Sequence, residues 1–230
     1  MVQIGLILLS VLMFSFILVG YRNALIKNGK DVTKNLLLVV GAALGWLTYV
    51  SILSGTKFLH TLELPPRFPI TIIVPFFAFG IIFYIKNKDN KTLQSLPLKW
   101  TALFQSFRIV VELFLYALAV DGILTNYATF DGYNFDILMG IIAPIIYLLI
   151  IKNKIGKNSL IALNLLGIAM VLFVGFIAAT TMYIPGVWGS NEQLTSYEFI
   201  DMPNLLVACF LAPMAIFIHL VSLIPLRAMK

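Results

Sequence analysis

The chain has 230 residues, of which 60% are hydrophobic and only 11% are charged. Soluble domains typically contain roughly 45–50% apolar and about 25% charged residues, so this composition excludes an ordinary soluble domain. It predicts an all-α polytopic membrane protein whose partner is the lipid bilayer. The net charge of +6 comes from loop lysines and arginines that suit anionic lipid headgroups, so we expect no nucleic-acid partner.

Seven apolar segments follow one another along the chain, and we expect each to form a transmembrane helix within a single domain, residues 1–230. A span needs about 20 residues, because a helix rises 1.5 Å per residue through a hydrocarbon core about 30 Å thick. The expected helices cover residues 2–20, 35–54, 69–86, 99–121, 136–151, 159–182 and 203–225. The fifth is short and contains Pro144, so we expect it to be barely tilted or partly unwound.

The basic residues predict the orientation of these helices. Thirteen of the 16 lysines and arginines follow the first, third, fifth and seventh helices. Because loops rich in lysine and arginine usually remain on the cytoplasmic side, we expect the N-terminus outside and the C-terminus in the cytoplasm. We expect the membrane to be the cytoplasmic (inner) membrane of a prokaryote. Most acidic residues fall on the outer side, where they form either a solvated rim or a vestibule that concentrates cations.

The helix order also suggests two parallel three-helix units joined by the fourth helix. The third and seventh helices both begin after an acid and a proline, and each carries a further proline, Pro75 and Pro213. Microbial opsins and seven-helix sugar transporters share this 3+1+3 order. However, residues 202–226 contain no lysine that could form a retinal Schiff base, and the sugar transporters' proline-glutamine turn is absent. We therefore expect neither retinal nor another cofactor.

The fourth predicted helix carries a polar stripe. At 100° per residue, Thr101, Gln105, Arg108, Glu112 and Tyr116 fall within an arc of roughly 80°. The rest of the helix is almost entirely apolar. This pattern indicates that one face of the helix turns toward protein and the other toward lipid.

Arg108 and Glu112 lie deep in that helix. Counted from Lys99, their depths are roughly 13 Å and 20 Å, where an ionised side chain costs about 2.5–3.5 kcal/mol. Their spacing allows a pair within the helix. One carboxylate cannot satisfy the five donors of a guanidinium, so we expect further partners on other helices. Depth matching proposes Asn164, Tyr147 and His219.

Two interpretations of this stripe remain open. In one, Gln105, Arg108, Glu112, Tyr116, Asn164 and His219 form a binding or proton-coupling site of a small transporter or channel-like protein for an unknown solute or ion. In the other, the charged pair only fixes helix register, and the chain is a receptor-like or scaffold protein. A membrane enzyme ranks last, because no catalytic set is visible; we expect none.

Several smaller features complete the expectations. Pro144, Pro213 and Trp46 are candidates for hinges or cavity walls. His60 and His219 are separated by the membrane, so we expect no metal site. We expect a monomer or small homo-oligomer. Residues 127–135 resemble a hairpin about an Asp-Gly turn, serving as an outer cap or as a ligand lid.

Overall fold

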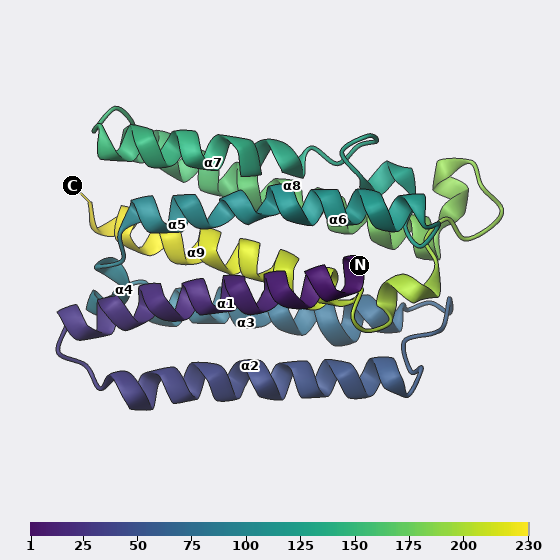
Figure 1. The fold of residues 1–230 in the computed structure, drawn as a ribbon, viewed down its shortest axis with the longest axis horizontal. Helices are drawn as coiled ribbons and strands as arrows, with labels where there is room; N and C mark the ends of the chain where they lie inside the picture. Colours follow the sequence, from purple (N-terminus) through teal and green to yellow (C-terminus); the bar gives the residue numbers. More distant parts are fainter. Residues whose placement is uncertain (230) are drawn as a thin grey trace.

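The structure, a computed structural model, describes residues 1–229, and it consists of helices that lie side by side along one axis (Figure 1). No strand occurs within these residues. The α-helices are α1 (Val2–Lys27), α2 (Val32–Gly55), α3 (Val74–Asn87), α4 (Lys91–Gln94), α5 (Leu98–Phe104), α6 (Arg108–Val120), α7 (Asp136–Ile151), α8 (Lys157–Tyr183) and α9 (Ala212–Ala228). Shorter turns are the π-helical η1 (Pro69–Ile73) and η6 (Val207–Leu211) and the 3-10 turns η2 (Gln105–Phe107), η3 (Asn126–Ala128), η4 (Pro185–Trp188) and η5 (Tyr197–Ile200).

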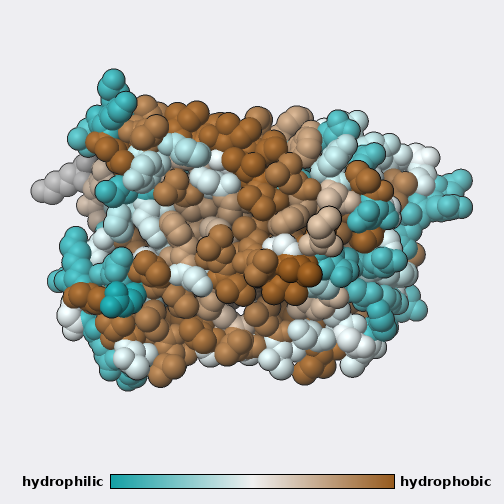
Figure 2. Space-filling model, in the orientation of Figure 1, coloured by the Kyte–Doolittle hydropathy of each residue, from teal (hydrophilic) through white to brown (hydrophobic). Residues whose placement is uncertain are grey.

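Six helical stretches are long and apolar enough to cross a membrane. They are Val2–Lys27, Val32–Gly55, Pro69–Asn87, Leu98–Val120, Lys157–Tyr183 and Val207–Ala228. Figure 2 shows the resulting apolar band, with polar residues gathered at both ends. The chain is therefore an integral membrane protein. The expectation of seven spans is supported for six of them, because α7 has only 16 residues.

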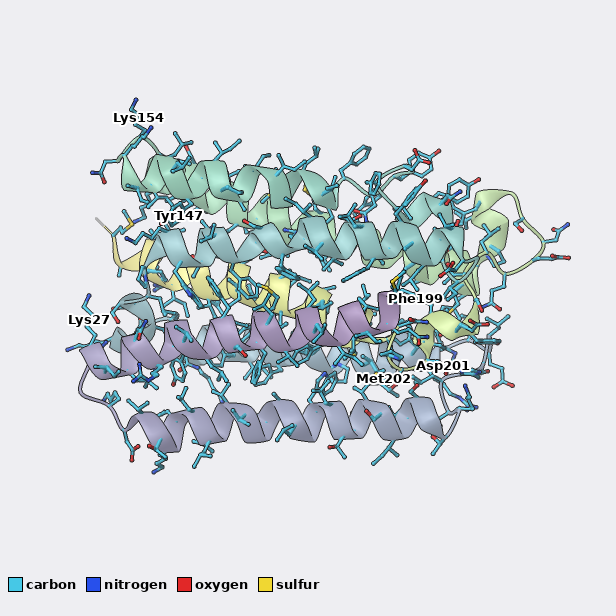
Figure 3. The ribbon with its side chains drawn as sticks, in the orientation of Figure 1. Lys27, Tyr147, Lys154, Phe199, Asp201 and Met202 are labelled. Atoms are coloured by element: carbon cyan, nitrogen blue, oxygen red, sulfur yellow. The ribbon has the colours of Figure 1, made fainter. Side chains whose placement is uncertain are left out.

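The two ends of the bundle differ in charge. Lysines gather at one end, where Lys27 and Lys154 lie (Figure 3), and we call it the lysine end. The other end, which we call the acidic end, carries Asp201 and the loops with Glu63, Asp121, Asp131, Glu192 and Glu198. Helices α5 and α6 form one span that runs from the lysine end to the acidic end.

Helix α9 lies at the centre of the bundle, and α2 lies at its edge (Figure 1). In the most apolar 18 residues of the span Val207–Ala228, which contains α9, 72% of the residues are buried, whereas the corresponding figure for α2 is only 6%. Helix α9 packs against α3, α5 and α8. A side chain on α9 therefore contacts protein in most directions, and this position suits polar groups that need partners away from lipid.

Helix α7 begins about halfway along its neighbour. Its first residue, Asp136, contacts Arg108, the eleventh residue of the 23-residue span Leu98–Val120. The preceding segment, residues 121–135, starts at the acidic end and folds back into the bundle as far as Asp136, instead of forming the predicted hairpin. It turns at Asp131-Gly132, but its hydrogen bonds belong to turns and to η3, not to paired strands. The hairpin prediction was wrong in structure, although the chain does reverse there.

Two prolines explain how the sparsely buried α2 is held. A proline in a helix cannot bond the carbonyl four residues before it, and Pro75 and Pro213 each follow a π-helical turn, η1 and η6. The two carbonyls left free are those of Thr71 and Cys209. The Tyr49 hydroxyl donates to the first at 3.2 Å, and the Trp46 indole N–H donates to the second at 2.9 Å. Trp46 therefore anchors α2.

Candidate functional site

Arg108 lies at the centre of a polar network in the middle of the bundle. Its side chain is 1% exposed and forms a bidentate ion pair with Asp136, in which the Nε–H donates at 2.7 Å and an Nη2–H donates to the other carboxylate oxygen. Nη1 lies 3.1 Å from His219 Nε2, and Nη2 also donates to the Gly167 carbonyl at 3.1 Å. These four hydrogen bonds come from α7, α8 and α9, so one guanidinium joins three helices to α6.

The predicted pair between Arg108 and Glu112 does not form. The arginine pairs with Asp136 of α7 instead. An arginine four residues before a glutamate is the less favoured order within a helix, and helical side chains lean toward the N-terminus of their helix. Arg108 therefore leans away from Glu112. The predicted contact with Tyr147 does not form either, because that residue is only half-buried and lies at the lysine end (Figure 3).

Glu112 is buried without a cation. It is 1% exposed, and no lysine, arginine or histidine nitrogen within residues 1–229 lies within 4.0 Å of its oxygens. Both carboxylate oxygens accept from the Asn134 amide at 2.8 Å. Asn134 also accepts from the Asp136 backbone N–H at 2.9 Å. The asparagine therefore holds both acids in place but neutralises neither.

Two glycines make room for this network. A Cβ on Gly140 of α7 would lie 2.8 Å from the Ile109 backbone nitrogen. A Cβ on Gly167 of α8 would lie 2.2 Å from His219 Nε2. Without side chains at these positions, α7 and α8 approach closely enough for Asp136 and the Gly167 carbonyl to reach Arg108.

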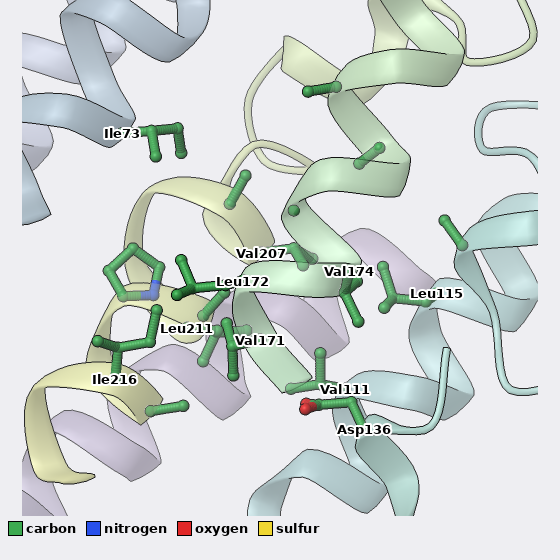
Figure 4. A pocket seen from close by; sticks show the side chains of 18 of the residues that line it. Ile73, Val111, Leu115, Asp136, Val171, Leu172, Val174, Val207, Leu211 and Ile216 are labelled. Atoms are coloured by element: carbon green, nitrogen blue, oxygen red, sulfur yellow. The ribbon is translucent and has the colours of Figure 1, made fainter. Parts of the chain in front are cut away.

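An apolar cavity of about 280 Å³ lies between α3, α6, α8 and the start of α9, on the acidic-end side of Arg108 (Figure 4). Glu112 and Asp136 are the charged residues of its lining, and Asp136 lies at one end of it beside Val111. Pro213 also lines it. The other walls are mainly aliphatic and aromatic. We call this the outer cavity.

A smaller cavity of about 40 Å³ lies on the lysine-end side of Arg108, and we call it the inner pocket. Gln105, Asn164 and His219 line it together with Ser222. The His219 Nδ1 lies 2.9 Å from the Asn164 amide oxygen, and Gln105 donates to the Ala215 carbonyl at 3.2 Å. The buried Gln105 Oε1 accepts no hydrogen bond from the described protein groups, and the pocket has room for a water molecule.

A polar cluster at the acidic end ties the loop after α2 to the segment before η6. Asp201 accepts hydrogen bonds from Lys57 at 2.7 Å and from His60 Nε2 at 2.8 Å, and His60 stacks on Tyr197. Burial raises the pKa of Asp201, but these two hydrogen bonds and the nearby positive charges outweigh it and lower the pKa below its ordinary value. Phe199, from the same segment, lines the outer cavity.

The structure brings Gln105, Arg108, Asn164 and His219 together, with Glu112 one turn further along. Tyr116 does not join them: it is 39% exposed and stacks on Phe130. Pro144 lies half-buried within the continuous helix α7 and lines neither cavity.

Three residues of the network were not predicted: Asp136, Asn134 and Gly167. The signal for the acid was the length of the uncharged run 137–151, which is too short to span a membrane. A helix of that length must begin inside the bilayer, which places its first residue beside a mid-span arginine.

Comparison with known protein families shows one match. The family described as a domain of unknown function, DUF8737, matches residues 65–227, and the chain belongs to this family. No curated protein and no solved structure matches the chain. The matched segment begins after α2 and contains every residue of the Arg108 network and of both cavities.

Proposed function

We propose that this DUF8737 protein is a small membrane transporter or channel-like protein whose solute binds in the outer cavity at Glu112. The observation that carries the proposal is a buried carboxyl group in the wall of an apolar cavity of about 280 Å³, with no cation of residues 1–229 paired to it. Burying an ionisable acid without an ion partner is costly. The fold retains this one beside a space that a solute can fill.

The arrangement of the two cavities supports transport more than static binding. The outer cavity and the inner pocket lie on opposite sides of the layer formed by Arg108, Asp136 and His219. A carrier exposes its central site to one side of the membrane at a time. In this proposal the Arg108 layer separates the two sides, and its rearrangement connects them.

Further elements of the proposal concern placement. We place the chain in a prokaryotic cytoplasmic membrane with the acidic end and N-terminus outside, following the lysine distribution. The parallel three-helix repeat gains support from the π-helical turns that precede Pro75 in α3 and Pro213 in α9. A monomer or small homo-oligomer without enzymatic activity remains our expectation.

The alternative is a receptor-like or scaffold protein. It is favoured by the Arg108 network, whose hydrogen bonds to Asp136, His219 and Gly167 leave the guanidinium well satisfied. Such a site can act purely as a connector between helices. Glu112 and the outer cavity distinguish the two functions, because a connector needs neither.

Cysteine accessibility tests the proposal without knowledge of the solute. Cys209, the single native cysteine, is first replaced by alanine. New cysteines are then placed at Val111 in the outer cavity, at Ala143 in the inner pocket, and at the fully buried Ile177, which lines neither. A membrane-impermeant cationic methanethiosulfonate is applied to right-side-out and to inverted vesicles.

A transporter predicts labelling of Val111→Cys from the outside and of Ala143→Cys from the inside, with Ile177→Cys unlabelled from both. Labelling of the outer position alone would favour the receptor. If neither cavity position reacts from either side, the proposed function is wrong.

A further inference from the structure

The outer cavity combines an apolar body with a negative end. Its walls include Phe68, Phe77, Phe107 and Phe199, together with aliphatic residues of α6, α8 and α9. Among the described residues of the chain, Glu112 and Asp136 are the charged ones in its lining. A ligand that fills it must therefore be largely apolar and must present its polar group at the end where these two acids lie.

The charges around that end do not balance. The Asp136 carboxylate is neutralised by the bidentate pair with Arg108, and no second cation in residues 1–229 approaches Glu112. When Glu112 is ionised and His219 is neutral, this cluster carries one surplus negative charge. One positive charge placed at Glu112 would complete it.

The cavity also reaches the lateral surface of the bundle. Leu172 and Phe176 of α8 line it, yet they are 45% and 55% exposed on the apolar band. Across the cavity stands Ile73 of η1 (Figure 4). An amphiphile dissolved in the bilayer can therefore reach the cavity from the side without crossing the polar ends of the protein.

We propose that the outer cavity binds an amphipathic monocation, with an aliphatic or aromatic body between α3 and α8 and an ammonium head on Glu112. This inference rests on the proposed function, because it names the class of solute that the same cavity takes. The volume of about 280 Å³ lies just below the usual range of ligand pockets, roughly 300–1,000 Å³. It therefore suits a single chain or ring better than a two-chain lipid.

An ammonium head fits Glu112 better than either alternative, the neutral hydroxyl of an alcohol or the anionic carboxylate of a fatty acid. A carboxylate accepts hydrogen bonds only, and the Asn134 amide leaves lone pairs of Glu112 unused. An ammonium offers three donors and a full charge, and charge-assisted hydrogen bonds are about twice as strong as neutral ones. An alcohol supplies one neutral donor, and a fatty acid adds a second negative charge.

Three probes that share an eight-carbon alkyl chain but differ in their head group test this inference. They are n-octylammonium, 1-octanol and octanoate. Each radiolabelled probe is equilibrated at pH 7 with the protein in lipid nanodiscs, and empty nanodiscs give the partition into lipid to be subtracted. We expect octylammonium to bind most tightly and octanoate most weakly. Glu112→Gln should weaken octylammonium binding by about 10-fold or more while changing 1-octanol binding little.

A second variant tests where the alkyl chain of the probe binds. Gly175 lines the cavity, and a Cβ there meets nothing within 4 Å. Gly175→Leu should therefore occupy the cavity without disturbing the fold and should weaken both octylammonium and octanol. Asp131→Asn, an exposed change at the acidic end, serves as the control for general surface attraction and should leave all three affinities unchanged.

The outcomes separate the inference from the proposed function. Equal affinity for amine and alcohol, both lost in Gly175→Leu, would overturn the cationic ligand and leave the cavity as a solute site. Retention of octylammonium affinity in Glu112→Gln would overturn it as well. If no probe binds and the cysteine at position 111 is also unreactive, both proposals fail.

Discussion

Arg108 shows how one charged residue can be accommodated at the centre of a membrane span. Its donors are used by a carboxylate, an imidazole and a backbone carbonyl, each from a different helix. This geometry depends on Gly167, whose missing side chain admits His219 and whose carbonyl faces the guanidinium. The smallest residue of the network is therefore as important as the charged ones.

Substitution of two glycines of α8 tests this dependence. Gly167→Ala places a Cβ 2.2 Å from His219 Nε2 in unrelaxed geometry, so His219 or α8 must move. We expect a loss of about 1–3 kcal/mol in the free energy of unfolding, the usual range for overpacking. Gly175→Ala in the same helix meets nothing within 4 Å and should be neutral or stabilising by up to about 1 kcal/mol. Unfolding of both variants in the same detergent provides the comparison, and equal stabilities would contradict the account.

The polar stripe was predictable from the sequence, but its partners were only partly so. The stripe correctly placed Gln105, Arg108 and Glu112 in the interior. Depth matching found His219 as a partner of Arg108, whereas Asn164 bonds His219 and not Arg108. The ion pair was missed because it depends on where α7 starts. Helical periodicity describes one helix at a time and carries no information about the path of residues 121–135.

At the scale of elements, α2 is the helix with the least burial and the most specific attachment. Two aromatic side chains, Trp46 and Tyr49, bond the carbonyls that Pro213 and Pro75 leave free. Both contacts join α2 to the helices next to the cavity. The sequence indicated the prolines and the tryptophan as special, but not that they belong to one contact.

Removal of either donor should loosen α2. Trp46→Phe deletes the indole N–H and leaves the Cys209 carbonyl, on a fully buried residue, without its donor. An unpaired buried acceptor costs about 1–3 kcal/mol. Hydrogen–deuterium exchange in α2 should increase, and thermal stability should fall. Tyr49→Phe should have a smaller effect, because this residue is exposed. Tyr84→Phe is the control, since the Tyr84 hydroxyl makes no hydrogen bond within the described residues. If Tyr84→Phe changed exchange and thermal stability as much as Trp46→Phe, Trp46 would not be the anchor of α2.

The cluster at the acidic end gives a pH dependence of known sign. The pKa of Asp201 is lowered in the folded protein by Lys57 and His60. Its contribution to stability is therefore complete above the ordinary value of 3.8 and is lost as the pH falls through the lowered folded value. The stability difference between the native chain and Asp201→Asn should shrink as the pH falls below about 4. Denaturation curves at several pH values measure it, and a difference that grows on acidification would contradict the assignment.

In the molecule as a whole, the family match and both cavities share one part of the chain. Helices α1 and α2 precede the segment that matches the family, whereas both cavities and the Arg108 network lie within residues 65–227. Composition and apolar run lengths predicted the all-helical membrane class and the approximate position of six spans. They could not predict that α7 starts inside the bundle, because this depends on tertiary contacts of Asp136 and Asn134.

In the proposed function, the two buried acids have different roles: Asp136 holds the bundle together through its pair with Arg108, and Glu112 binds the solute in the outer cavity. The free energies of unfolding of the isosteric variants Asp136→Asn and Glu112→Gln, measured in one detergent, test this difference in role. Breaking a buried pair leaves Arg108 uncompensated, so Asp136→Asn should lose about 3–5 kcal/mol. Glu112→Gln removes no ion pair and should change stability by about 1 kcal/mol or less. A greater loss for Glu112→Gln than for Asp136→Asn would contradict the account.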